Sequence, residues 1–227
     1  MKIFEVGGSV RDEILGLKNK DRDFCVEAES FDAMRDGILA LGGVIFLEKP
    51  EFTTIRAKMG KDDIRDFVLC RKDGAYSDGR HPDTIEAGTL LDDLARRDFT
   101  MNAIARDGDG NLVDPFGGVE DIKAGVIRCV GSARERMSED ALRMLRALRF
   151  SIVKGMRIND EILALFENDE ILSLIENSIS TERIREELHK MFARDSFASV
   201  MLLARFPRLL KILVSRGLWL EPTMRKA

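Results

Sequence analysis

The stretch 3-IFEVGGSVRDEILGLKNKDRDFCVE-27 decides how the first part of the chain folds. The apolar run at 3–6 indicates a strand, and the apolar positions within 9–17 recur at helical spacing. A second strand is predicted at 22–27, so the segment folds as strand, helix, strand. Because a glycine pair stands at the turn between the first strand and the helix, the backbone there can approach a bound phosphate closely.

Two aspartates stand at the beginning of the second strand. Asp21 and Asp23 are two residues apart, and residues at that spacing in a strand point to the same face. Two carboxylates held close together repel each other unless a positive charge lies between them. We therefore expect either a solvated turn or a bound cation at this pair.

Beyond this stretch the first 130 residues mix helix and strand signals. A helix is predicted over 30–43, because Ser30 is a favourable N-cap and glycines end the apolar pattern. The remaining signals predict strands at 44–48, 53–59 and 64–71, a polar loop at 72–88, and a helix that runs into a strand at 90–105. After about residue 131 only helices are predicted, over 135–152, 160–176, 180–193 and 196–217. The fold class is therefore α+β, with an all-helical second part.

The composition is that of an ordinary globular chain of 227 residues, of which 44% are hydrophobic and 33% charged. No apolar run approaches the ~18 residues that span a bilayer, so no membrane partner is expected. The three cysteines are widely spaced, which favours a reducing, cytoplasmic setting over a disulfide frame or a zinc site. Net charge is −4, yet basic residues outnumber acidic ones over 183–227. That tail is either an ordinary amphipathic helical surface or a phosphate-binding one.

Asp66 adds a third carboxylate, in the middle of a predicted strand. Ile64 and Val68 share its face, so this side chain needs a partner. A salt bridge with Arg65 or Arg71 would supply one, and so would a metal ion. Two aspartates on one strand and a third on its neighbour can hold two Mg²⁺ ions for in-line phosphoryl transfer.

Five motifs occur in order along the chain, namely GGSVRDEILGLKNKDRDF from residue 7, LARRDFTMNAIA from 94, DPFGGVEDI from 114, EDALRMLRALRF from 139 and STERIREEL from 180. Together they resemble the ordered motifs of the class II tRNA nucleotidyltransferases, or CCA-adding enzymes, most of which bacterial poly(A) polymerases share. The resemblance covers residues 1 to about 190. It implies a polymerase-β-like nucleotidyltransferase head at 1–130, a helical neck at 131–190 that recognises the base, and a short helical body at 191–227.

The resemblance also implies roles for single residues. Asp21 and Asp23 match the two metal-binding aspartates, and Asp66 matches the third catalytic acid. Alongside Gly7 of the glycine turn, the positions that match nucleotide contacts are Gly8, Arg11, Arg97, Asp98 and Asn102. The last three match residues that hold the nucleotide and help to choose a ribose over a deoxyribose. The implied cofactor is Mg²⁺.

The motif at 139–150 is expected to read the base. On one continuous helix Asp140 and Arg143 lie one turn apart, so a carboxylate and a guanidinium can imitate a Watson–Crick edge. The resemblance assigns this motif the role of a protein template for cytosine and adenine. Arg146 and Arg149 continue the stripe and are expected to reach the triphosphate or the neighbouring strand. By itself the same spacing also describes an ordinary helix with an i, i+3 ion pair.

Two further segments bear on the reaction and on the length of the protein. The loop at 71–83 resembles the flexible loop that CCA- and A-adding members use when they switch from CTP to ATP, which implies addition of A; an exposed loop without function is the alternative. Ser180, Glu182, Arg183 and Glu187 match the motif that braces the neck. Family members continue well beyond this point, so the body that ends at Ala227 is expected to be either naturally short or truncated.

The expected function is template-independent addition of CCA to the 3′ end of tRNA, from CTP and ATP. Two alternatives stay open: a poly(A) polymerase that uses ATP alone, and a non-catalytic RNA-binding relative. The three predicted acids argue against the second, because mutually repelling carboxylates have no use without a cation. A nucleotidyltransferase for protein or antibiotic substrates would lack the EDxxR helix. The sequence does not reveal the oligomeric state.

Overall fold

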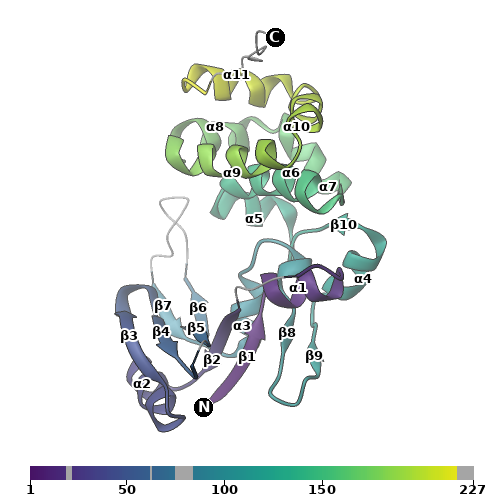
Figure 1. The fold of residues 1–227 in the computed structure, drawn as a ribbon. Helices are drawn as coiled ribbons and strands as arrows, with labels where there is room; N and C mark the ends of the chain where they lie inside the picture. The colour runs from purple at the N-terminus through teal and green to yellow at the C-terminus, as the bar shows by residue number, and fades with distance from the viewer. Residues whose placement is uncertain (19–21, 62, 75–83, 219–227) are drawn as a thin grey trace, which may run out of the picture. The chain divides into compact units, whose positions relative to one another are not determined.

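The computed structural model describes residues 1–18, 22–61, 63–74 and 84–218 (Figure 1). These residues divide into two compact units, and the boundary between them falls after Gly131. The first unit holds a mixed β-sheet with its helices, and the second is built of helices. Among the described residues, no helix combines the length and the apolar composition needed to cross a bilayer.

The first unit is organised by a seven-stranded sheet of order β3-β4-β5-β2-β1-β8-β9. Its strands are β1 Lys2–Val6, β2 Asp23–Glu27, β3 Val44–Lys49, β4 Thr54–Lys58, β5 Ile64–Leu69, β8 Ala105–Arg106 and β9 Leu112–Val113. β2 and β5 run parallel, while β1 pairs antiparallel with both β2 and β8. The strands predicted from the sequence are confirmed, and the parallel pair places the beginnings of β2 and β5 next to each other.

Two helices cover the two faces of this sheet. On one face α2 (Phe31–Ala40) buries Met34 and Ile38 against Ile55 and Phe67 of the strands. The remaining helical pieces of the unit are α1 Gly8–Ile14, η1 Pro50–Phe52, α3 Leu90–Ala95, η2 Thr100–Asn102 and α4 Gly118–Ala124. Fully burying an apolar side chain of this size contributes about 1.5–3 kcal/mol, so the α2 interface is a main source of the sheet's stability.

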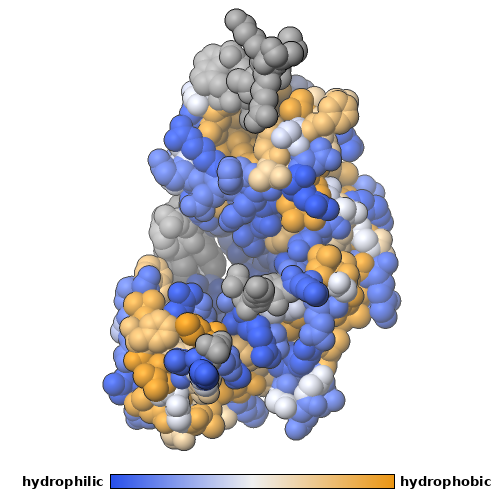
Figure 2. Space-filling model, viewed as in Figure 1, coloured by the Kyte–Doolittle hydropathy of each residue, from blue (hydrophilic) through white to orange (hydrophobic). Residues whose placement is uncertain are grey.

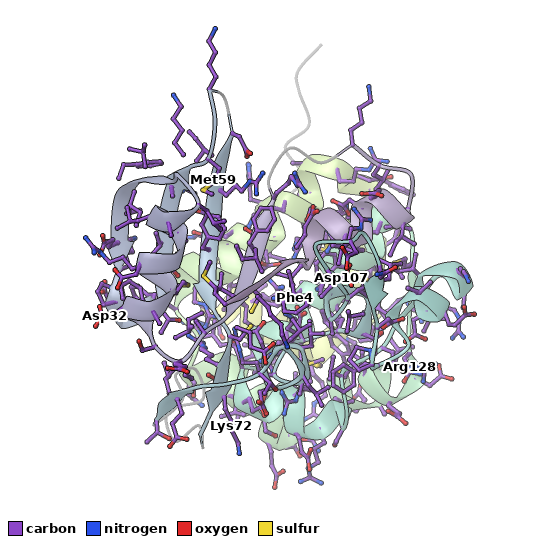
Figure 3. All side chains as sticks on the ribbon, turned by 90° about the horizontal axis from the view of Figure 1, so that it is seen from below. Phe4, Asp32, Met59, Lys72, Asp107 and Arg128 are labelled. Atoms are coloured by element: carbon purple, nitrogen blue, oxygen red, sulfur yellow. The ribbon has the colours of Figure 1, made fainter. Side chains whose placement is uncertain are left out.

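The opposite face of the sheet packs against α3. Leu90 and Leu94 of α3 share a core with Phe4 of β1 and Cys25 of β2. Phe4 lies in the interior in Figure 3, whereas Asp32 on α2 is at the outer surface. The edge strand β3 exposes apolar side chains, and Figure 2 shows them gathered at the lower left.

Side-chain caps fix where the two covering helices begin. The Ser30 hydroxyl accepts a hydrogen bond from the Ala33 amide at 3.1 Å, which confirms the predicted N-cap. Thr89 and Asp92 form a reciprocal capping box at the start of α3. In that box the Thr89 amide donates to Asp92 Oδ2 at 2.8 Å. Each cap satisfies backbone donors that have no partner within the helix.

The prediction of a loop over 72–88 is wrong at both ends of that range. β6 (Arg71–Asp73) and β7 (Ile85–Ala87) pair as antiparallel strands. Polar sequence hid this pairing, because backbone hydrogen bonds rather than an apolar pattern hold such a short ladder. Residues 75–83, which include most of the predicted specificity loop, lie outside the described residues.

The second unit contains only short to medium helices in its described part beyond one strand, β11 Arg157–Ile158. The helices are α5 Ala133–Glu139, α6 Leu142–Lys154, α7 Asp160–Ala164, η3 Leu165–Glu167, α8 Asp169–Asn177, α9 Thr181–Arg194, α10 Ser196–Leu203 and α11 Pro207–Ser215. α6 packs along α9, and α8 packs along α11. The helical character predicted after residue 131 is confirmed.

The prediction of a single helix over 135–152 is wrong, and this correction matters for the site. Asp140 has extended backbone angles, φ −151° and ψ 100°, and separates α5 from α6. Its carboxylate accepts a hydrogen bond from the Leu142 amide at 3.1 Å. An aspartate side chain that accepts a hydrogen bond from a free amide at the start of a helix favours a helix break at that aspartate. The sequence contains no glycine or proline at this position that would have indicated the break.

Two buried cysteines touch inside the first unit. The Sγ atoms of Cys25 and Cys70 lie 2.6 Å apart, and both side chains are thiols. The hydrogen bond to Cys70, together with burial, raises the pKa of the Cys25 thiol. These residues therefore behave as small core side chains rather than as nucleophiles.

Candidate nucleotide-binding and catalytic site

Asp23 and Asp66 stand opposite each other on neighbouring strands. Asp23 begins β2, and its register partner in parallel β5 is Asp66. Side chains at paired positions point to the same face, so both carboxylates lie on one side of the sheet. Cys25, two residues after Asp23, packs against α3, which places the acids on the face that α3 covers. Asp21 lies outside the described residues.

The Asp66 carboxylate has an arginine partner that the sequence did not reveal. Arg56 is its register partner in antiparallel β4. Arg56 donates from Nε to Oδ1 at 2.5 Å and from Nη2 to Oδ2 at 2.6 Å. The alternative partners considered from the sequence, Arg65 and Arg71, bind other carboxylates.

The acidic pair fits a divalent cation by the chemistry of its donors. Carboxylate oxygens are the hard ligands that Mg²⁺ binds, and Asp23 and Asp66 present them from adjacent strands. Among the described residues, no group of three His, Cys, Asp or Glu side chains is close enough to hold a metal ion. The predicted set of three carboxylates includes Asp21, so the described part supplies two of them.

The turn between β1 and α1 leaves room for an arginine. Gly7 has φ +72° and ψ −123°, a conformation that glycine adopts readily and other residues do not. A Cβ at Gly7 would come within 2.8 Å of Arg97 Nη1. The same nitrogen donates to the Asn102 carbonyl oxygen at 3.0 Å. Gly8 follows as the first residue of α1. The glycine turn and the Arg97 guanidinium therefore lie against each other.

Arg11, Asn102 and Asp98 form a buried chain of hydrogen bonds. Arg11 Nη1 donates to Asn102 Oδ1 at 2.5 Å, and Asn102 Nδ2 donates to Asp98 Oδ1 at 2.8 Å. Each of the three residues is only 7% exposed. Because the Asn102 amide is held at both ends, its orientation is fixed before any ligand binds.

Asp93 is the residue of this cluster that sequence reasoning missed. Its carboxylate is buried and accepts hydrogen bonds from both Arg96 and Arg97. Burial by itself would raise the pKa of Asp93, but the charges and hydrogen bonds of the two arginines outweigh burial and hold that pKa below its ordinary value. The signal was present, since arginines at i+3 and i+4 follow Asp93 on the helix.

The helical unit does not place Asp140 beside Arg143 on one helix, which corrects that prediction. Asp140 lies in the break before α6, where Arg183 Nη2 donates to its Oδ2 at 2.7 Å. Arg143 is on α6 and donates to Glu139 Oε2 at 2.6 Å and to the Arg136 carbonyl oxygen at 2.8 Å. Both side chains are thus positioned by partners from other elements rather than by each other.

The stripe formed by Arg146 and Arg149 faces α9. Both guanidiniums pair with Glu187, a carboxylate that is 5% exposed. A buried carboxylate between two arginines ties α6 to α9, which agrees with the expectation that the motif around Glu187 braces this region.

The predicted site residues therefore fall into two groups. Within the first unit the structure gathers the described acids on one face of the sheet, and it gathers the glycine turn with Arg11, Arg97, Asp98 and Asn102. Within the second unit it holds Asp140, Arg143, Arg146 and Arg149 through ion pairs. What these arrangements offer chemically is a carboxylate pair for a cation and fixed donors for a phosphorylated ligand.

Comparison with known proteins identifies a matching family and relatives of this chain. Residues 3–128 match the family described as the poly(A) polymerase head domain. A multifunctional CCA protein of Nitrosomonas eutropha is 40% identical over 171 residues, which are 74% of this chain and 38% of that protein.

Solved structures show the same likeness in three dimensions. The CCA-adding enzyme of Bacillus stearothermophilus in complex with CTP is 32% identical, with a TM-score of 0.72, over 95% of this chain and 48% of that one. A tRNA nucleotidyltransferase complexed with a primer tRNA and an incoming ATP analogue is 30% identical, with a TM-score of 0.75, over 93% of this chain and 59% of that one. The chain thus spans about half the length of these relatives. It belongs to the family of tRNA nucleotidyltransferases and poly(A) polymerases.

Proposed function

We propose that the chain transfers nucleotides to the 3′ end of tRNA, adding C, C and A from CTP and ATP without a nucleic-acid template. One observation carries the proposal: Asp23 and Asp66 face each other on β2 and β5, on the face of the sheet covered by the helix that leads into Arg97. The relatives support the substrates, since one was solved with CTP and another with a primer tRNA and an ATP analogue.

The nucleotide would bind at the glycine turn. Arg97 and Arg11 supply positive charge for the triphosphate, and Gly7 and Gly8 keep side chains out of its way. Asn102, held by Arg11 and by Asp98, offers a fixed amide for the ribose. Preorganised donors of this kind need no rearrangement when charge develops in the transition state.

The carboxylates would hold Mg²⁺. Asp21 and Asp23 are its proposed ligands, and Asp66 acts with them as the third acid. When bound, two such ions supply charge neutralisation at the leaving pyrophosphate and a lowered pKa at the attacking hydroxyl. The protein's own part includes keeping Asp23 and Asp66 on one face, which the β2–β5 register does.

Selection of the base is assigned to the second unit. Asp140 offers carboxylate acceptors and Arg143 offers guanidinium donors, and together these match the edges of cytosine and adenine. Arg183 holds Asp140, and Glu139 holds Arg143. Arg146 and Arg149, fixed by ion pairs to one carboxylate of α9, complete the proposed nucleotide contacts. Held side chains read an edge more selectively than mobile ones, because less ordering accompanies binding.

The test is incorporation of labelled CTP and ATP, separately and together, into a tRNA that lacks its CCA end. We expect two C residues followed by one A, then a stop, in the presence of Mg²⁺ and no product in EDTA. A long A tail from ATP alone would identify a poly(A) polymerase instead. Complete absence of product, together with retained tRNA binding, would favour the non-catalytic relative.

A further inference from the structure

The ion pair between Arg56 and Asp66 stands inside the acidic face. β5 lies between β4 and β2, so Asp66 has Arg56 on one side and Asp23 on the other (Figure 1). Both oxygens of Asp66 accept hydrogen bonds from the fork of Arg56, at 2.5 and 2.6 Å. The arginine therefore neutralises the carboxylate that stands in register with Asp23.

This pairing has two consequences for a cation at the same face. The guanidinium fork uses one lone pair on each oxygen of Asp66, and those oxygens are the ones a metal ion would need. Its positive charge also repels a divalent cation placed between Asp66 and Asp23. The pair is not locked in the interior, because the side chains of Arg56 and Asp66 are 46% and 29% exposed. An exposed ion pair is weak enough to be exchanged for a metal ion.

We propose that Arg56 is a positioning residue that occupies the Asp66 carboxylate before the metal arrives and competes with the divalent cation for it. In the metal-free protein Arg56 neutralises Asp66 beside Asp23 and holds its carboxylate through two hydrogen bonds on the same face of the sheet. Metal binding then transfers Asp66 from the guanidinium to the cation. The inference rests on the proposed function, because it assumes that Asp23 and Asp66 are metal-binding acids.

The experiment is titration of the whole chain with Mn²⁺, followed by electron paramagnetic resonance of the free ion, without nucleotide or tRNA. We expect Arg56→Met to bind Mn²⁺ about fivefold more tightly than the wild type, the upper range for one exposed ion pair. Arg56→Lys keeps the charge and loses the fork, so its affinity should lie between those of the wild type and Arg56→Met. The matched control is Arg35→Met, which removes a 42% exposed arginine paired with Glu48 at the edge of the same sheet. Its Mn²⁺ affinity should equal that of the wild type.

A double-mutant cycle separates competition from a general charge effect. In the Asp66→Asn background, Arg56→Met should tighten Mn²⁺ binding clearly less than in the wild-type background, because only the repulsion by the arginine charge is then relieved. Equal tightening with and without the carboxylate, or no tightening in Arg56→Met, would overturn the competition while leaving the proposed metal site intact. Mn²⁺ binding that neither Asp23→Asn nor Asp66→Asn weakens would overturn the metal site itself, and the inference with it.

Discussion

Replacement of Asp93 by asparagine should destabilise the first unit strongly. The carboxylate is fully buried and accepts four hydrogen bonds, two from Arg96 and two from Arg97. Asparagine keeps the size but loses the charge and one acceptor oxygen. It therefore removes the buried counter-charge that Arg96 and Arg97 share, while Arg96 keeps a longer ion pair with Asp73 at 3.8 Å.

The magnitude follows from the burial of the three partners. Breaking a buried ion pair by removing one partner costs about 3–5 kcal/mol. Arg96 and Arg97 have side chains that are 24% and 21% exposed, so water relieves part of that cost. We expect Asp93→Asn to lower the free energy of unfolding by about 3 kcal/mol, a large share of the ~5–15 kcal/mol typical of a domain.

The assay is urea unfolding followed by far-ultraviolet circular dichroism, at several pH values. The pKa of Asp93 is depressed in the folded state, so its contribution is fully present above the unfolded pKa of about 4 and is lost as pH falls through the folded value. The difference between wild type and Asp93→Asn should be constant from pH 7 to 5 and shrink below about pH 4. Asp92→Asn, its exposed neighbour in the capping box, is the control and should cost about 1 kcal/mol. A loss below about 1 kcal/mol for Asp93→Asn, or a difference that grows in acid, would refute the reasoning.

Three further predictions use the same unfolding measurement. Gly7→Ala should lower the free energy of unfolding by about 2–3 kcal/mol and weaken equilibrium binding of CTP, because the new Cβ meets the Arg97 side chain. Gly16→Ala is the control, since Gly16 also has positive φ but open space around it, and should lower that free energy by about 1 kcal/mol. Equal losses would mean that the contact with Arg97 is unimportant. Glu187→Gln should lower the free energy of unfolding by about 3 kcal/mol because it removes a buried negative charge that two arginines of α6 bind, and exposed Glu186→Gln should change that free energy little; similar values for the two would contradict the brace. Thr89→Ala should lower the free energy of unfolding by about 1 kcal/mol because it removes the capping box of α3. An unchanged urea midpoint would show that the box contributes nothing to stability.

The sequence predicted the parts of this molecule that depend on local pattern. The strands that carry Asp23 and Asp66 follow from short apolar runs, and the start of α2 follows from the Ser30 cap. The break at Asp140 escaped prediction because helical apolar spacing continues across it, while the hydrogen bond from the Leu142 amide and the ion pair with Arg183 favour the extended backbone.

Side-chain pairs between neighbouring strands could not be predicted from the sequence for a different reason. The match of Arg56 with Asp66 depends on the register between β4 and β5, and a shift of one residue would turn Arg56 to the opposite face. Register is set by pairing over the whole sheet, so it cannot be read from either strand by itself. The chain of hydrogen bonds from Arg11 through Asn102 likewise joins residues 91 positions apart.

The most direct test of the account is the rate of labelled CTP incorporation into tRNA lacking its CCA end, by the wild type and by Asp23→Asn. Asparagine keeps the shape of an exposed residue at the start of β2, so the circular dichroism spectrum should not change. The account predicts a loss of at least about a hundredfold, because the proposed cation loses the charge that holds it. Incorporation by Asp23→Asn at the wild-type rate would contradict the assignment of this face of the sheet as the catalytic centre.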